Sequence, residues 1–214
     1  MTNSRKLALT GQIGLAAAVL VGIGEFLLHH DAEARYTSTF AFFEGVTRER
    51  ATIGHFFGVL GAPLYLVGVY HIYLMLRPAN EMVARVACLV MAYGFVVGDV
   101  WIGSRSTAGE LVNTIAIPEQ LDLYVLRYES LLQIVRVAAL LFSGMFIWLC
   151  LTGRSLYPRA MALLNPVLLI ALAFVIFFTV PAVGQYIMPI ALNVAFFVLF
   201  ATSLVVASRL ETED

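Results

Sequence analysis

Long apolar runs separated by short polar segments fill this chain from end to end. A helix crosses the hydrocarbon core of a bilayer in about 20 residues, and several of the runs reach that length. Proline-containing breaks such as Arg77-Pro78-Ala79-Asn80 divide them from one another. The pattern predicts six spanning helices, at about residues 7–29, 52–76, 84–103, 122–151, 160–180 and 186–207.

The composition makes lipid the expected surroundings of these helices. Hydrophobic residues make up 61% of the 214-residue chain and charged residues only 13%, whereas soluble domains carry about 25% charged residues. We therefore expect an all-α, multi-pass protein of the cell membrane, folded as one domain over residues 1–214. The net charge is −1 and Lys6 is the only lysine, so nucleic acid is not an expected partner and the lipid bilayer is.

Arginine and lysine are distributed unevenly between the two ends of the predicted bundle. One end carries Arg5, Lys6, Arg77, Arg85, Arg154, Arg159 and Arg209. The loops at the other end carry Arg35, Arg48, Arg50 and Arg105. Because loops rich in positive charge remain on the cytoplasmic side, we expect both the N and the C terminus in the cytoplasm.

One predicted span combines an apolar run with a polar stripe. Residues 131–151 are apolar enough to cross a bilayer, yet the same helix carries Glu129, Gln133 and Arg136. Their spacing of i, i+4 and i+7 places them on one helix face. An ionisable group inside a spanning helix costs roughly 2.5–3.5 kcal/mol on insertion scales, so it indicates a partner, a wet cavity or a functional role.

Charged residues on three different predicted helices fall at a similar depth. Glu25, Asp99 and Arg136 each lie about one turn below the outer surface in the predicted topology. Because each needs a partner in the apolar slab, we expect them to converge. Two carboxylates with one guanidinium leave an excess negative charge, which a proton or a bound cation would offset.

The histidines extend this polar cluster. His29 follows Glu25 by four residues and therefore lies on the same helix face. His55 begins the second predicted span at about the height of His29. His71 lies roughly 24 Å farther along that helix, so one site cannot contain both, and we expect His71 at the cytoplasmic membrane interface.

The cluster supports a first interpretation as a ligand pocket in the outer half of the membrane. A small molecule or a lipid-like ligand would contact Arg136, Gln133, His55, Tyr128 and Trp101. Arg136 would hold an anionic head group or a carboxylate. Of the acid–base residues Glu25, His29, Asp99 and Glu129, His29 or Glu25 would move protons.

Two other interpretations use the same residues. In one, the protein is a membrane-embedded enzyme, either hydrolytic with the four acid–base residues just named as catalytic groups, or metal-dependent with a divalent metal on His29, His55, Glu25 and Glu129. In the other, the cluster is a structural network that fixes helix packing, and the protein is a structural or assembly subunit.

Small residues and a proline predict local packing. The small-x3-small patterns of Gly54 to Gly58 and Gly94 to Gly98 should let the second and third spans approach each other closely. Trp101 and Tyr128 are expected in the outer aromatic belt, with Tyr128 also a wall of the pocket. Asn165 should bond the backbone groups that Pro166 leaves unpaired.

Three strings resemble a family of uncharacterised bacterial multi-helix membrane proteins. They are Gly24-Glu25-Phe26-Leu27-Leu28-His29-His30, residues 62–73 (APLYLVGVYHIY), and Leu164-Asn165-Pro166. The resemblance implies a six-helix integral protein of the bacterial inner membrane. It implies no activity, because none is assigned to that family, but it raises the interest of His71 and Tyr65, which lie in the second string.

Overall fold

The computed structural model describes residues 3–33, 40–114 and 118–211. In these ranges the chain forms helices and no strand. The α-helices are α1 (Asn3–His29), α2 (Arg48–Gly61), α3 (Leu64–Leu76), α4 (Glu81–Thr114), α5 (Pro118–Leu151), α6 (Pro166–Thr179), α7 (Pro181–Ile187) and α8 (Ala191–Glu211). Short 3-10 helices are η1 (Ala41–Gly45), η2 (Arg159–Leu164) and η3 (Met188–Ile190).

Five helical segments in the described ranges are long and apolar enough to cross a membrane. They are Ser4–His29, Arg48–Leu76, Glu81–Thr107, Asp122–Leu151 and Pro181–Leu210. The predicted all-α bundle is therefore confirmed, and its helices are those of a multi-pass membrane protein. The predicted span at 160–180 is represented by α6, which is apolar but has only 14 residues.

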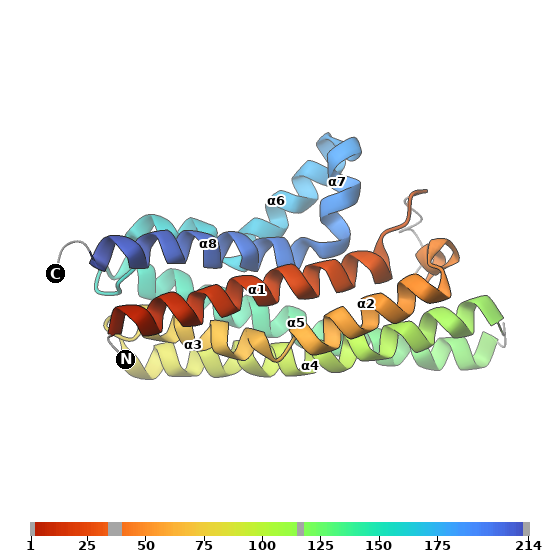
Figure 1. Cartoon of the computed structure of the whole chain (residues 1–214), viewed down its shortest axis with the longest axis horizontal. Coiled ribbons are helices and arrows are strands. Elements are labelled where there is room, and N and C mark those ends of the chain that lie inside the picture. The colour runs from red at the N-terminus through yellow and green to blue at the C-terminus, as the bar shows by residue number, and fades with distance from the viewer. Residues whose placement is uncertain (1–2, 34–39, 115–117, 212–214) are drawn as a thin grey trace.

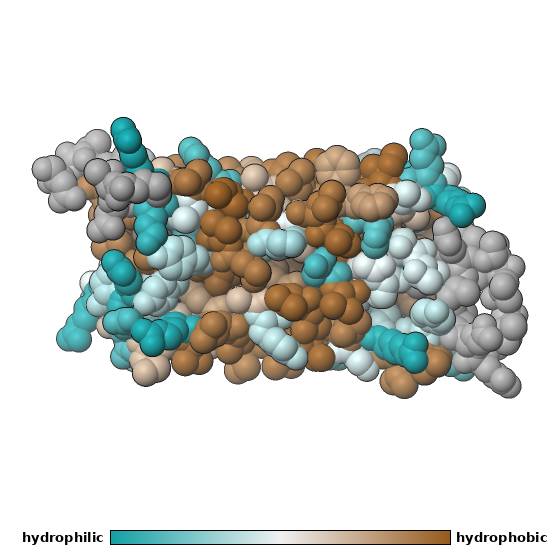
Figure 2. Space-filling model, turned by 60° about the horizontal axis from the view of Figure 1, so that its bottom comes forward, coloured by the Kyte–Doolittle hydropathy of each residue, from teal (hydrophilic) through white to brown (hydrophobic). Residues whose placement is uncertain are grey.

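The long helices lie side by side in an elongated bundle, and α1 begins at the end where α8 finishes (Figure 1). We call this the terminal end and the opposite one the distal end. Figure 2 shows a mostly hydrophobic band across the middle of one face, with hydrophilic side chains gathered toward the two ends. A bundle that crosses a bilayer presents such a surface.

The second span bends at a proline without ending. Pro63 separates α2 from α3 because it has no backbone N–H and its ring clashes with the preceding turn. The chain continues through the break by hydrogen bonds from Ala62 N to Gly58 O (2.9 Å) and from Tyr65 N to Ala62 O (3.0 Å). Both halves consequently remain one membrane segment, as the prediction for 52–76 requires.

The helix α4 is longer than predicted, and this changes the site. The prediction ended this helix at Gly103 and assigned residues 104–120 to an outer loop, but α4 continues to Thr114 and α5 begins at Pro118. The polar residues after Gly103 stay helical because α4 is packed against neighbouring elements here; a Cβ on Gly109 would lie 2.9 Å from the ring of Phe43. Arg105 is thereby a helical residue and not a loop residue.

The segment predicted as a fifth span is divided. After η2, Asn165 caps α6 by accepting a hydrogen bond from Leu168 N (3.1 Å), which confirms the role predicted for it. The 14 residues of α6 give a length of about 21 Å, and α7 then turns the chain back. The hairpin of α6 and α7 extends away from the rest of the bundle toward the distal end (Figure 1).

Glycines allow close helix contacts in the distal half, and one of them joins helices for which no such contact was predicted. A Cβ on Gly24 of α1 would lie 2.5 Å from the backbone nitrogen of Gly58 in α2. Gly58 also faces Ile102 of α4, so the predicted approach of the second and third spans is present there. Gly94 instead faces Ala138 of α5, at 2.8 Å from a Cβ placed on the glycine.

Candidate functional site

The centre of the polar cluster is Arg105, which lies on α4 and is fully buried. Its guanidinium donates through Nη1 to Glu25 Oε1 (3.1 Å) and through Nη2 to the hydroxyl of Tyr128 (3.0 Å). It also stacks over the Trp101 ring, with 3.9 Å from Cζ to the ring centroid. One cation therefore joins α1, α4 and α5.

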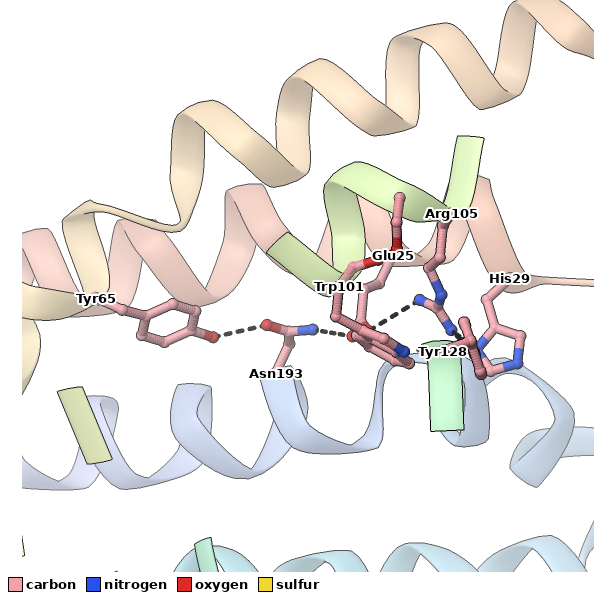
Figure 3. Close-up of polar contacts among 8 residues, drawn as sticks. Glu25, His29, Tyr65, Trp101, Arg105, Tyr128 and Asn193 are labelled. Atoms are coloured by element: carbon pink, nitrogen blue, oxygen red, sulfur yellow. Dashed lines mark hydrogen bonds and ion pairs between the residues drawn. The ribbon is translucent and has the colours of Figure 1, made fainter. Parts of the chain in front are cut away.

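Glu25 has hydrogen-bond donors for both carboxylate oxygens. Arg105 occupies Oε1, and the side-chain amide of Asn193 on α8 donates to Oε2. The amide oxygen of Asn193 in turn accepts from the Tyr65 hydroxyl on α3 (2.7 Å). Figure 3 shows this connected path from Tyr65 to His29. The predicted partner of Glu25 was Arg136; the structure replaces it with Arg105.

The hydrogen bonds of His29 define its tautomer. Arg105 Nη2 lies 3.0 Å from His29 Nδ1, and a guanidinium can only donate, so Nδ1 accepts and carries no proton. The imidazole also hydrogen bonds to the backbone of Pro189, which offers only a carbonyl oxygen. His29 is thus a neutral imidazole that donates through Nε2, and it ties α1 to η3.

A cavity of about 200 Å³ lies beside this network, between α1, α4, α5, α6 and the start of α8. Its polar side is formed by Glu25, His29, Trp101, Tyr128 and Arg136. The remaining walls are apolar and include Leu132, Ala139, Ile170 and Phe174. The structure therefore brings together five of the residues predicted for the pocket.

Two residues of the cavity wall carry donors with no close partner among the described residues. Trp101 is 8% exposed, and its indole N–H has no hydrogen-bond partner among the described residues. Arg136 contacts Glu129 of its own helix at only 3.8 Å, and these side chains are 53% and 41% exposed. Both groups are donors, so the free chemistry of the cavity favours a ligand that accepts hydrogen bonds.

Asp99 lies next to this site but not in the same cavity. With Glu25, Tyr65, Trp101 and Asn193 it borders a separate space of about 30 Å³, which is large enough for one water molecule. One carboxylate oxygen of Asp99 has no partner in the part of the chain that the structure describes. The predicted convergence of Asp99 with Glu25 is present, whereas Asp99 and Arg136 border different spaces.

Gln133 and His55 do not line the cavity, in contrast to their predicted role. Gln133 is exposed in an apolar groove of about 550 Å³ on the outer face of α4 and α5. His55 of α2 lies 3.5 Å from the hydroxyl of Ser106 and packs against Phe56. Gln133 and Arg136 lie about 60° apart around α5, since three residues rotate a helix by about 300°. This offset is enough to place Arg136 at the cavity and Gln133 in the outer groove.

The predicted metal site of His29, His55, Glu25 and Glu129 is not assembled. Within residues 3–33, 40–114 and 118–211, no three His, Cys, Asp or Glu side chains are grouped so as to hold a metal ion. The physical reason is Arg105, whose positive charge occupies the position between Glu25 and His29 where a cation would bind. Glu129 faces Arg136 instead.

A second polar cluster lies at the terminal end and includes His71. The prediction placed His71 at the membrane interface, but it is fully buried, with Nε2 at 2.6 Å from Ser203 Oγ and Nδ1 at 3.4 Å from Thr10 Oγ1. Ser203 also contacts the hydroxyl of Tyr157 (2.7 Å). Burial raises the pKa of Tyr157, so its hydroxyl stays protonated. This cluster joins α1, α3 and α8 to the segment after α5.

Sequence reasoning missed Arg105, Asn193 and Tyr65 as members of the distal network. Arg105 follows Gly103-Ser104 and begins a polar stretch, so hydropathy alone assigns it to a loop. One signal could have identified it: an arginine four residues after Trp101 shares its helix face and can stack on the indole. Asn193 and Tyr65 are uncharged. Tyr65 stood out only through the family resemblance of residues 62–73, and nothing in the sequence around Asn193 distinguishes it.

No curated protein and no solved structure matches the chain. A family model does match residues 1–104, which include α1 to α3 and α4 as far as Ser104. Glu25, His29 and Trp101 lie inside the matched segment, and Arg105 directly follows it. The resemblance to an uncharacterised family is thereby confirmed, and over residues 1–104 the chain matches a family of unknown function (DUF6796).

Proposed function

We propose that this chain is an integral membrane protein with six membrane segments that binds a small or lipid-like ligand in the distal cavity. The five long segments and α6 provide the six passes. The observation that carries the proposal is that Trp101, a residue of the cavity wall, has a buried indole N–H without a partner among the described residues. An unpaired buried donor costs about 1–3 kcal/mol, and a ligand that accepts this hydrogen bond removes that cost.

The Glu25–Arg105 ion pair holds the residues of the cavity wall in place. Both carboxylate oxygens of Glu25 accept hydrogen bonds, and Arg105 fixes the positions of Trp101, Tyr128 and His29 around the cavity. Glu25 is therefore a positioning residue in this proposal, and the groups that contact the ligand are Trp101 and Arg136. The proposal assigns no proton transfer to Glu25.

The proposal places both termini in the cytoplasm and the cavity in the outer half of the membrane. Arg105 is buried in the helix bundle and no longer counts among the loop charges of the distal end. Arg48 and Arg50 remain there, with Arg35 outside the described residues, against seven basic residues at the terminal end. This larger difference favours a cytoplasmic terminal end.

Native mass spectrometry of the full chain, extracted in mild detergent, tests the proposal. We expect a non-covalently bound small molecule on the wild type and its absence from Ala139→Trp, because Ala139 is 4% exposed and a larger side chain there fills the cavity. Val137→Trp is the matched control. Val137 is on the same helix but 52% exposed, so this variant should keep the bound molecule.

Each alternative result has a defined meaning. If the wild type carries no bound molecule, or if Ala139→Trp retains it, the proposed binding function is wrong. If Ala139→Trp loses thermal stability and nothing else, the structural or assembly role is favoured. Stoichiometric metal in the same preparation, measured by elemental analysis, would favour the metal-dependent enzyme.

A further inference from the structure

We infer that the ligand of the distal cavity is a single-chain amphiphile with a carboxylate head, whose acyl chain extends between α5 and α6 into the bilayer. This inference rests on the proposed function and adds the class of ligand and its route of access. Three features of the cavity carry it: its size, the chemistry of its free donors, and the side of the bundle that it reaches.

The size of the cavity fits part of such a ligand and not the whole. Pockets that enclose a complete drug-sized ligand have volumes of about 300–1,000 Å³, whereas the distal cavity has about 200 Å³. A head group and a few methylene groups fill this space. The rest of the ligand must then lie outside the protein in the hydrocarbon core of the bilayer, and a hydrocarbon chain suits those surroundings.

The free donors fit a head group with two oxygens and one negative charge. Arg136 and Trp101 both line the cavity, and the guanidinium and the unpaired indole N–H can each donate to one carboxylate oxygen. Arg105 adds no net charge, since Glu25 neutralises it. Arg136 has only a long, half-exposed contact with Glu129 (3.8 Å), so its guanidinium can turn to the head group of a ligand. One available cation favours a monoanion over a dianion, and a neutral head group would make no charge-assisted hydrogen bond with it.

The cavity reaches the side of the bundle from which α6 diverges. The start of α6 is attached to α5 by the hydrogen bond from Val167 N to Ser143 Oγ (3.3 Å). Farther along, α6 diverges toward the distal end (Figure 1). Ile170 and Phe174 of α6 line the cavity, and Phe174 is still 42% exposed. A chain that leaves here meets the apolar outer faces of α5 and α6, where Leu140 and Leu172 are more than half exposed.

The distribution of polar and apolar residues on the cavity walls agrees with this orientation of the ligand. The charged and aromatic residues of the cavity come from α1, α4 and α5, whereas the wall contributed by α6 is apolar. An amphiphile therefore has its head group at Arg136 and Trp101 and its chain beside Ile170 and Phe174. A phosphodiester lipid has the same charge, but its glycerol and second chain exceed a cavity of this size.

Tryptophan fluorescence provides the test, because the chain has only two tryptophans. Trp148 is 50% exposed near the terminal end of α5, and Trp148→Phe leaves Trp101 as the single reporter. This variant, in nanodiscs, is titrated with a dibrominated long-chain fatty acid, whose bromine atoms quench indole fluorescence. We expect saturable quenching. Dibrominated monoacylglycerol and dibrominated phosphatidylglycerol should quench without saturation, and acetate or inorganic phosphate should not compete.

Substitutions at Arg136 identify the head-group contact. In the Trp148→Phe background, Arg136→Gln should weaken the apparent affinity for the fatty acid by about tenfold or more, which corresponds to about 1.4 kcal/mol. Arg136→Lys should recover most of the affinity, and Arg85→Gln, an exposed pair partner near the terminal end, should leave it unchanged.

The inference is wrong if the neutral amphiphile or the phospholipid saturates as the fatty acid does, or if Arg136→Gln binds the fatty acid normally. Its failure can be told apart from failure of the proposed function. A molecule of another class that is bound to the wild type and displaced by Ala139→Trp overturns this inference alone. A cavity that holds no molecule at all overturns both.

Discussion

At the scale of single residues, the distal network depends on one buried ion pair. Arg105 and Glu25 meet at 3.1 Å with side chains that are 0% and 9% exposed. Such a pair costs much to desolvate, so its net contribution to stability is small. Removing one partner is different, because the other charge then stays buried and uncompensated.

We therefore expect Arg105→Gln to lower the free energy of unfolding by about 3–5 kcal/mol. Arg85→Gln is the control. Arg85 pairs with Glu81 at 2.7 Å on the exposed surface of α4, and such solvent-screened pairs add little to stability. Unfolding in mixed micelles, followed by circular dichroism, measures the difference; equal losses for the two variants would contradict the central role of Arg105.

The sequence indicates some residues of this network and hides others for physical reasons. Glu25 and Arg136 stand out because a charge within an apolar run has a high insertion cost, and both line the cavity. Arg105 lies at the edge of its run, where hydropathy cannot distinguish a helix inside the bundle from a loop. The partner of Glu25 was misassigned because similar depth does not determine which way a side chain points around its helix.

At the scale of elements, the distal half is held together by the contact between α1 and α2. Gly24 makes this contact possible, because the backbones of the two helices approach too closely for a side chain. We expect Gly24→Ala to cost about 1–3 kcal/mol of stability, as overpacked sites do, since the added Cβ would meet Gly58 N at 2.5 Å and Gly54 O at 2.8 Å.

Gly144→Ala on α5 is the matched control for this prediction. A Cβ at Gly144 has no atom within 4 Å, and alanine is favoured over glycine in a helix by about 1 kcal/mol. This variant should therefore be neutral or more stable. Thermal unfolding of both variants in the same detergent measures the difference in stability. A Gly24→Ala variant as stable as the wild type would contradict the prediction, because α1 and α2 would then separate at little cost.

Elements were predicted best where a long run has a clear break at each end. The first, second and fourth spans agree closely with the helical segments, since polar or proline-containing breaks such as Arg77-Pro78 mark their limits. The extension of α4 beyond Gly103 depends on packing against α5 and η1, which local sequence does not reveal. The division of the fifth span into η2 and α6 has a visible cause in Pro166, and Pro181 marks the turn after α6. The direction in which α6 leaves the bundle depends on tertiary contacts.

At the scale of the whole molecule, the asymmetry between the two ends connects the fold to the proposed function. Basic residues gather at the terminal end, while the buried ion pair and the cavity lie toward the distal end. If positive charge determines orientation, the cavity faces the outer half of the membrane. A ligand would then reach it from the outer leaflet between α5 and α6.

Cysteine labelling in intact cells tests this orientation. The native Cys88 and Cys150 are buried, so they give little background. Glu49 at the distal end and Arg154 at the terminal end are both exposed and suit single substitutions by cysteine. We expect a membrane-impermeant maleimide to label Glu49→Cys in intact cells and Arg154→Cys only after permeabilisation. The opposite result would invert the topology and place the cavity in the cytoplasmic half, where the ligand would come from the inner leaflet while the contacts at Arg136 and Trp101 remained the same.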